Sequence, residues 1–421
     1  MKQFLAILLL IFVLLGSNIC FAQDSLRLMA TLKGERECAS AGDVNGDGFK
    51  DIVTGNLQGN GYVKIYLGGV NFDTIPDLTI TGDGGAFGCA VASAGDLNRD
   101  GYDDIIVGAR ATYKLRQGHG AGKACIFFGG DPMDNTVDLV LEDSRLFFRY
   151  GSSVCSAGDL NNDGYDDVLV AAPEGMDARG RAYVYFGAED MDTLCDLRIL
   201  GHSDSSEHLG RSIAGIGDIN SDGYDDILIG SPYAGGNLQL GKASVYFGGG
   251  SMDSIPDLSF WGDSKRFQNF GAKVASAGDL DGDGIPDILI GNSKRTKIFF
   301  GGSLSEENSQ IILPEGKSIS SAGDLNKDGY GDIIISGGKD PEKCYIFYGG
   351  TEMDGEADII LKAGDTTFTD FGLKVVGLGD INGDGYDEIM ISSKGNSIYY
   401  GIAYIYTSNP ALIQEEKTKE E

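Results

Sequence analysis

The sequence predicts an all-β protein: a seven-bladed β-propeller of four-stranded blades, with an N-terminal strand that completes the last blade and closes the ring. Three observations lead to this prediction. A nine-residue acidic pattern recurs seven times, each copy precedes a run of branched aliphatic residues, and each unit contains four strand-like segments. Self-similarity with a period of roughly 55 residues is typical of a repeat architecture.

The acidic pattern is D-x-(N/D)-x-D-G-x-x-(D/E), and its copies begin at Asp43, Asp96, Asp159, Asp218, Asp279, Asp324 and Asp380. Side-chain oxygens at positions 1, 3, 5 and 9 and the main-chain carbonyl at position 7 can converge on one ion, because Gly at position 6 permits a sharp turn. Oxygen donors in this number suit Ca²⁺ better than Mg²⁺. We therefore expect up to seven Ca²⁺ ions, one per blade.

The expected calcium ligands, copy by copy, are Asp43, Asn45, Asp47, Phe49 and Asp51; Asp96, Asn98, Asp100, Tyr102 and Asp104; Asp159, Asn161, Asp163, Tyr165 and Asp167; Asp218, Asn220, Asp222, Tyr224 and Asp226; Asp279, Asp281, Asp283, Ile285 and Asp287; Asp324, Asn326, Asp328, Tyr330 and Asp332; and Asp380, Asn382, Asp384, Tyr386 and Glu388. We expect weaker binding in the sixth copy, which has Lys327 at position 4, and in the seventh, which has Glu388 at position 9. The alternative is a set of metal-free Asx-turn hairpins, which the mutual repulsion of three clustered carboxylates disfavours.

The charge balance agrees with a metal-binding role. The formal net charge is −30, and the seven loops supply 22 of the carboxylates, so much of the acidity belongs to predicted ligands. The remaining negative charge argues against nucleic acid or an anionic membrane as a partner.

Residues 1–22 have the pattern of a secretory signal peptide, with Lys2 before an apolar core and a small-x-small site ending at Ala22. A lipoprotein anchor at Cys20 is the alternative. We expect a secreted protein, extracellular or at the cell surface, with the periplasm as another compartment; no later segment is apolar enough to span a bilayer. The six remaining cysteines are expected to be mostly buried free thiols, with room for one or two disulfides. The lack of an Asn-x-Ser/Thr sequon favours a bacterial source.

Each unit offers four strands, which in the second unit are Cys89–Ala94, Asp104–Gly108, Ala124–Phe128 and Val137–Leu141. The acidic loop joins the first strand to the second, and the third strand ends in an aromatic-glycine signature. The last unit has only three strands, but Ser25–Gly34 resembles a fourth strand, so we expect it to complete the seventh blade. The predicted domains are the signal peptide, a propeller at 23–407 and a charged tail at 408–421.

With these motifs the chain resembles FG-GAP repeat proteins, such as the N-terminal propeller of integrin α chains. The motifs are Phe87-Gly88, Phe270-Gly271 and Phe371-Gly372, with Tyr150-Gly151 and Leu209-Gly210 as variants, and Gly-Ala-Pro-like elements at Gly108-Ala109-Arg110, Ala171-Ala172-Pro173 and Gly230-Ser231-Pro232. The resemblance implies a stand-alone, monomeric propeller of this family that acts in adhesion or recognition. Integrin α chains continue into further domains and a membrane helix, so the resemblance does not carry over a heterodimer partner.

Seven identical catalytic sites would be unusual, so calcium is expected to stabilise the blades. A ligand, either an extracellular protein or a glycan, is expected on the opposite face, where the loops vary in length. The candidate ligand residues are Arg110, Tyr113, Lys114, Arg116, Arg179, Arg181 and Tyr233. The alternative function is a calcium-dependent carbohydrate-active enzyme, a polysaccharide lyase or hydrolase. The three histidines, His119, His202 and His208, form no recognised catalytic motif, so we expect a protein that is not an enzyme.

Overall fold

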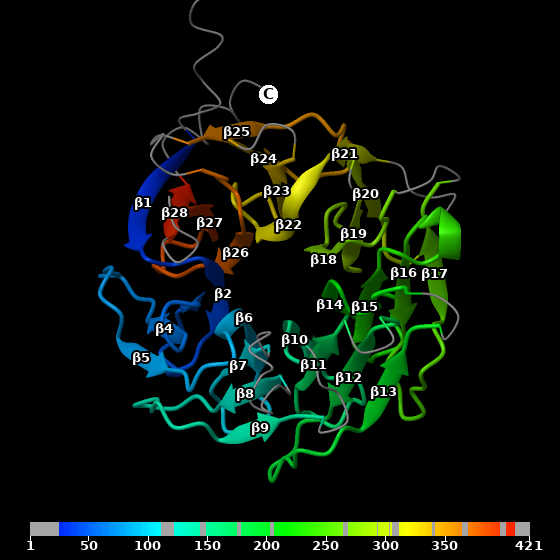
Figure 1. The fold of residues 1–421 in the computed structure, drawn as a ribbon. Helices are drawn as coiled ribbons and strands as arrows, with labels where there is room; N and C mark the ends of the chain where they lie inside the picture. The colour runs from blue at the N-terminus through cyan, green and yellow to red at the C-terminus, as the bar shows by residue number, and fades with distance from the viewer. Residues whose placement is uncertain are drawn as a thin grey trace, which may run out of the picture.

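The computed structural model describes residues 25–110, 122–143, 149–174, 178–202, 206–263, 268–292, 294–302, 304, 311–338, 342–363, 369–395 and 401–408. Within these ranges, 28 strands form seven antiparallel sheets of four strands each, arranged as a ring (Figure 1). The innermost strands of all seven sheets line a central cavity, called the channel below. The prediction of an all-β, seven-bladed propeller is confirmed. In the described part of the chain, no helix is long and apolar enough to cross a membrane.

The strands follow the order of the repeats, from the channel outward in each blade. The innermost strands are β2 (Glu37–Gly42), β6 (Phe87–Gly95), β10 (Ser153–Gly158), β14 (Ile213–Gly217), β18 (Lys273–Gly278), β22 (Gly316–Gly323) and β26 (Val375–Gly379). The second strands are β3 (Asp51–Asn56), β7 (Asp104–Ala109), β11 (Asp167–Ala172), β15 (Asp226–Ser231), β19 (Asp287–Gly291), β23 (Asp332–Gly337) and β27 (Glu388–Lys394).

The third strands are β4 (Tyr62–Tyr66), β8 (Lys123–Phe127), β12 (Arg181–Tyr185), β16 (Lys242–Tyr246), β20 (Arg295–Phe299), β24 (Lys343–Phe347) and β28 (Gly401–Ser408). The outermost strands are β5 (Leu78–Thr81), β9 (Leu139–Leu141), β13 (Leu197–Leu200), β17 (Leu258–Trp261), β21 (Ile312–Pro314), β25 (Ile359–Lys362) and β1 (Leu26–Lys33). One short 3₁₀ helix, η2 (Gly236–Leu238), lies between β15 and β16.

The N-terminal strand closes the ring as predicted. Strand β1 pairs antiparallel with β28, and the sheet order is β1-β28-β27-β26, so blade seven is made from both ends of the propeller. Figure 1 shows blue β1 beside red β28. Because the outer strand of the last blade comes from the start of the chain, neither end leaves an open gap in the ring.

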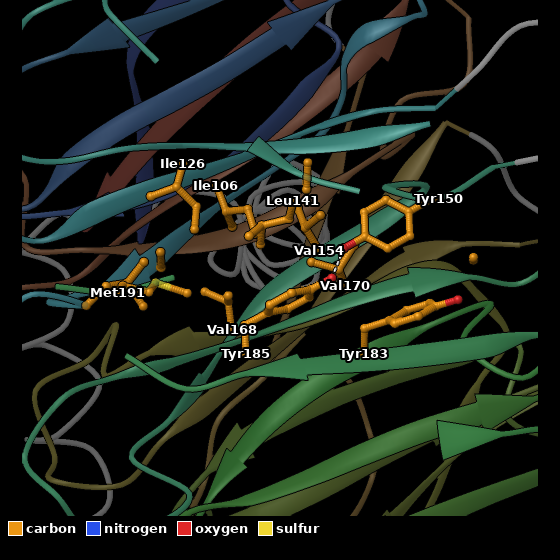
Figure 2. Close-up of a cluster of buried hydrophobic side chains, with 14 residues drawn as sticks. Ile106, Ile126, Leu141, Tyr150, Val154, Val168, Val170, Tyr183, Tyr185 and Met191 are labelled. Atoms are coloured by element: carbon orange, nitrogen blue, oxygen red, sulfur yellow. Dashed lines mark hydrogen bonds between the residues drawn. The ribbon is translucent and has the colours of Figure 1, made fainter. Parts of the chain in front are cut away.

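The hydrophobic core lies between blades. Seven clusters of buried side chains are found in the described residues, one for each pair of adjacent blades, blades seven and one included. The second strands are buried on both faces, for example all six residues of β7, which explains their continuous aliphatic runs. In the cluster between blades two and three, the Tyr150 and Tyr185 hydroxyls are 2.6 Å apart (Figure 2). Tyr150 belongs to the Phe-Gly-like element, so this element fills the space between blades.

A β-bulge precedes each acidic loop. The register between first and second strands shifts just before the loop in all seven blades, as between Ser93 and Gly95 in blade two. Gly95 has a φ of 74°, and a Cβ there would meet the Asp166 carboxylate of the next blade. Glycine is therefore required both by the backbone conformation and by the close approach of blade three.

Candidate metal sites

Each acidic loop folds its side-chain oxygens inward onto its own backbone. In the loop between β6 and β7, the two oxygens of Asp96 accept the N–H groups of Asp100 and Gly101 at 3.0 and 2.9 Å. Asn98 Oδ1 also accepts the Asp100 N–H at 3.0 Å, and Asp100 Oδ1 accepts the Tyr102 N–H at 3.1 Å. Positions 1, 3 and 5 therefore form a compact turn lined by oxygen atoms. The bond from the position-6 N–H to position 1 and the bond from the position-7 N–H to position 5 recur in all seven loops. The bond from the position-5 N–H to position 1 recurs in the first six.

The carboxylate at position 9 is buried beneath this turn. Asp104 has no exposed surface, and its two oxygens accept the N–H groups of Leu97 and Gly129 at 2.9 and 2.8 Å. Gly129 belongs to the aromatic-glycine signature at the end of β8. Position 9 therefore ties the loop to the third strand of the same blade. Burial raises the pKa of Asp104 to about 8, with a further contribution from the charges of Asp100 and Asp96.

The same burial raises the pKa of the other six position-9 side chains. Loss of hydration is the largest cause in each case, and the values are about 7 for Asp51, Asp226, Asp287 and Glu388 and about 8 for Asp167 and Asp332. Glu388 is one methylene longer and also accepts a hydrogen bond from the Asn382 side-chain amide at 2.7 Å. In five of the other loops the equivalent Asn donates to the Asp at position 5.

The fifth loop brings three carboxylates together. Oxygens of Asp279, Asp281 and Asp283 lie within 4.8 Å of one another, and no other group of three Asp, Glu, His or Cys side chains in the described ranges is as close. Loss of hydration and the charges of Asp283 and Asp279 raise the pKa of Asp281. The buried carboxylate at position 9, Asp287, is not part of this group; its oxygens accept N–H groups of Leu280 and Gly301.

This donor set fits a hard divalent cation. Calcium binds oxygens at about 2.3–2.6 Å, so ligands on opposite sides of the ion are roughly 5 Å apart, which agrees with the spacing of the three aspartates in the fifth loop. In the other six loops Asn replaces Asp at position 3 and offers an amide oxygen instead. The hydrogen bonds within the loops do not exhaust the carboxylates, because each oxygen has two lone pairs.

Position 8, which the sequence analysis did not single out, links neighbouring blades. Asp103 of blade two accepts the Asp43 N–H of blade one at 2.7 Å. The same bond joins Asp166 to Asp96, Asp225 to Asp159 and Asp387 to Asp324, at 2.8, 3.0 and 2.8 Å. The other three copies have Lys50, Pro286 and Gly331 at this position. A pair of acidic residues at positions 8 and 9 is the signal in the sequence: the carboxylate at position 8 accepts an N–H of the preceding blade, and the one at position 9 accepts N–H groups of its own blade.

Positions 4 and 7 form a second contact between blades. The residue at position 4 has a positive φ in all seven loops. Where it is glycine, at Gly46, Gly282 and Gly383, an added Cβ would meet the position-7 ring of the next loop. Lys327 Nζ lies 5.2 Å from the ring centroid of Tyr386, and the Arg99 guanidinium lies 6.0 Å from that of Tyr165. Lys327, expected to weaken metal binding in its own loop, thus reaches over the aromatic residue of the seventh.

The candidate ligand face lies at the opposite ends of the strands from the acidic loops. Arg110 directly follows β7, Arg179 and Arg181 stand at the start of β12, and Tyr233 follows β15. The Tyr233 ring packs edge-on against His208, with centroids 4.8 Å apart, and burial lowers the pKa of His208. Tyr113, Lys114, Arg116 and His119 lie outside the described residues, as do the predicted signal peptide and nearly all of the tail.

The six cysteines in the described residues are free thiols, as expected for most of them. Cys38, Cys125 and Cys344 are buried, and Cys89, Cys155 and Cys195 are partly buried. Burial raises the pKa of the Cys38 and Cys155 thiols to about 12. High thiol pKa values indicate structural rather than reactive cysteines.

Comparison with known proteins adds sequence evidence to this geometry. Residues 150–185 and 209–246 match the FG-GAP repeat, and residues 43–107 and 279–335 match the FG-GAP-like repeat, so the matches include the first six acidic loops. The chain is 34% identical to integrin alpha-5 of Xenopus laevis over 224 residues, which are 50% of this chain and 20% of that protein. It is 32% identical to integrin alpha pat-2 of Caenorhabditis briggsae over 213 residues (46% and 17%) and 34% identical to integrin alpha-3 of Cricetulus griseus over 161 residues (36% and 15%). The matched regions span a fifth or less of these relatives.

Proposed function

Because the chain is an integrin-α-like FG-GAP β-propeller, we propose that it is a recognition module that binds a protein or glycan outside the cell, with Ca²⁺ stabilising its blade loops. The likeness to integrin α chains favours binding over catalysis. The observation that carries the calcium part is the convergence of Asp279, Asp281 and Asp283 in a loop that shares two of its hydrogen bonds with every other blade.

Calcium would be held by positions 1, 3, 5, 7 and 9 of each loop, and it would neutralise carboxylates that otherwise repel one another. Because the same loops are hydrogen-bonded to the neighbouring blade, as Asp103 is to Asp43, a fixed loop also fixes the blade interface. Ion binding to the folded state alone stabilises that state by mass action. A structural role for the ion follows from this repetition.

The recognition part is supported by the contrast between the two faces. The acidic loops have one length and share two hydrogen bonds, whereas the described connections on the opposite face differ from blade to blade, and one of them contains η2. Variable loops on a rigid frame are the usual location of binding residues. Arg110, Arg179, Arg181 and Tyr233 are the described members of this candidate face, which suits an acidic ligand.

Calcium binding is tested with residues 23–421 after removal of metal. We expect added Ca²⁺ to raise Tm by about 10 °C or more and native mass spectrometry to count up to seven ions. Asp283→Asn should lower the maximum count by one, while Asp190→Asn, an exposed aspartate outside the loops, should leave it unchanged. If Ca²⁺ changed neither Tm nor mass, the Asx-turn alternative would hold.

Recognition is tested by a binding screen of the same protein against glycans and extracellular-matrix proteins in millimolar Ca²⁺. A saturable partner that is lost on joint substitution of Arg110, Arg179, Arg181 and Tyr233 by Ala is the expected result. Each glycan that binds is then incubated for hours and examined for new reducing ends or unsaturated products. Such products would replace the recognition proposal with a carbohydrate-active enzyme.

A further inference from the structure

The central channel contains a cavity of about 580 Å³ lined by the innermost strands of all seven blades. Its charged lining residues are Arg211, Lys273, Lys317, Lys374 and Glu37. All five stand at or near the start of an innermost strand, and the acidic loops follow the other ends of these strands, so the five residues lie on the opposite face of the ring. Among the residues that line the cavity, four cations therefore stand against one anion, Glu37.

This local charge contrasts with the rest of the molecule. The chain carries a formal net charge of −30, yet the charged side chains lining this cavity are mainly basic. The four cations come from four consecutive blades, four to seven, so they line one side of the channel mouth. Like charges gathered in a confined space repel one another, and an anion in the cavity would relieve that repulsion.

Two of the four cations have a carboxylate neighbour. Lys317 Nζ lies 2.9 Å from Asp370, and Arg211 lies 3.9 Å from Glu174. In the part of the chain that the structure describes, no carboxylate lies within ion-pair distance of Lys273 or Lys374. Both side chains are open to solvent in the channel.

The electrostatics of Lys273 reflect this shortage of negative charge. The Lys273 side chain is exposed to the channel, but the many protein atoms around it reduce the hydration of its ammonium group. Loss of hydration, followed by the charges of Lys374 and Arg211, lowers the pKa of Lys273 to about 8, and Glu37 offsets this only in part. The ammonium group is still mostly protonated at pH 7 and is available to bind an anion.

The remaining lining limits what such an anion can be. No aromatic side chain lines the cavity among the described residues, so a neutral sugar could not stack there. The polar lining consists mainly of serine hydroxyls, including those of the partly exposed Ser153 and Ser320, which can donate to oxyanions. The volume lies within the range of small-molecule sites. Charge and hydrogen bonding would therefore carry recognition, and the ligand has to be compact.

We propose that the mouth of the central channel binds a compact oxyanion through Lys273 and Lys374, supported by Arg211 and Lys317. Its carboxylate, sulfate or phosphate groups come either from a free small molecule or from the charged end of an acidic glycan. The second source depends on the proposed recognition function, and the first does not. The cavity opens on the same face of the ring as Arg110, Arg179, Arg181 and Tyr233, but none of these four residues lines it.

The test is calorimetric titration of residues 23–421 in calcium at pH 7 with sulfate, succinate, a sulfated disaccharide and neutral lactose. We expect at least one anion to bind and lactose not to bind. Lys273→Met with Lys374→Met should weaken anion binding by about tenfold or more, because two charge-assisted contacts are lost. Lys362→Met removes an exposed lysine from outermost strand β25 and should have no effect.

Two further measurements exclude a folding defect. The double variant should have a Tm without anion at least equal to that of the wild type, because the substitutions remove repulsion. Lys273→Arg should retain binding, because it keeps the charge.

Binding of sulfate or succinate identifies a free small molecule as the source, whereas binding of the disaccharide alone identifies a glycan terminus. The proposal is wrong if none of the three anions binds, or if the double variant binds as the wild type does, whatever the result of the matrix and glycan screen.

Discussion

The carboxylate of Glu35 and the ammonium group of Lys64 lie 2.6 Å apart at the joint where the ring closes. Glu35 is fully buried in the connection from β1, the outer strand of blade seven, to β2, the inner strand of blade one. Its second oxygen accepts the Thr54 hydroxyl at 2.9 Å. Both oxygens of this buried charge are therefore partnered by blade one, so the pair holds the closing strand's connection to that blade.

We expect Lys64→Met to lower the free energy of unfolding by about 3–5 kcal/mol, because it leaves Glu35 buried without a counter-charge. Urea denaturation monitored by fluorescence measures this loss. A double variant with Glu35→Leu should recover most of it, and Lys33→Met, at an exposed lysine of β1, should change stability by less than about 0.5 kcal/mol. Equal effects of Lys64→Met and Lys33→Met would contradict the role of the pair.

The bond between blades at position 8 predicts a measurable loss of stability. Asp166→Ala leaves the Asp96 N–H of the preceding blade without its acceptor and should cost about 1–3 kcal/mol relative to Asp166→Asn, which keeps an acceptor oxygen. The comparison with Asn removes the effect of charge. Equilibrium denaturation at a fixed Ca²⁺ concentration provides the measurement, and equal stability of the Ala and Asn variants would show that the bond contributes nothing.

The seven position-9 carboxyl groups predict the pH dependence of the metal-free protein. Their pKa values, raised to about 7 or 8, exceed those of an unfolded chain. The folded state therefore holds more protons than the unfolded state between about pH 4 and pH 8, and stability falls as pH rises through this range. In chelator, Tm at pH 8 should be lower than at pH 5 by about 5 °C or more.

Saturating Ca²⁺ should reduce this fall in Tm, because a bound cation favours the ionised carboxylates. The comparison requires the same two pH values with and without metal. A Tm that rises from pH 5 to pH 8 in chelator would mean that burial does not hold these groups protonated.

The burial of the cysteines predicts how slowly they react with thiol reagents in the folded protein. With the pKa of Cys38 and Cys155 at about 12, the thiolate fraction at pH 8 is on the order of 10⁻⁴, and thiol reagents react with the thiolate. The native protein of residues 23–421 should therefore react negligibly with a disulfide reagent within minutes, and six thiols should react after unfolding in guanidinium. Rapid reaction of several thiols in the native protein would contradict the buried positions.

The repeats explain why so much of the fold could be predicted from the sequence. The acidic loops mark the turn between the first and second strands, and the pairing of β1 with β28 follows from a missing strand at one end and a spare strand at the other. Position 8 was missed for a physical reason. The role of Asp103 depends on its hydrogen-bond partner, the Asp43 N–H, which is 60 residues earlier in the chain. The two groups become neighbours only when blades one and two pack together.

The channel cations were missed for a related reason. Arg211, Lys273 and Lys374 each follow a Phe-Gly-like pair by one or two residues, and Lys317 follows Gly316. Within any one repeat this is a single basic residue beside a strand, which is common. Only the ring brings the four side chains to one channel mouth. Aligning the repeats on their Phe-Gly pairs would have revealed the column of basic residues.

The pairing of β1 with β28 also sets how the propeller responds to tension. Leu26, where β1 begins, lies opposite Ser408, where β28 ends, so both ends of the propeller leave blade seven at the same end of the β1–β28 strand pair. A force applied to Leu26 and Ser408 therefore breaks the hydrogen-bonded residue pairs of β1 and β28 one after another, starting at that end, instead of shearing all the pairs together. Blade seven is thus the weak point under an end-to-end load, whereas each of the other six blades is a continuous stretch of chain enclosed by its neighbours.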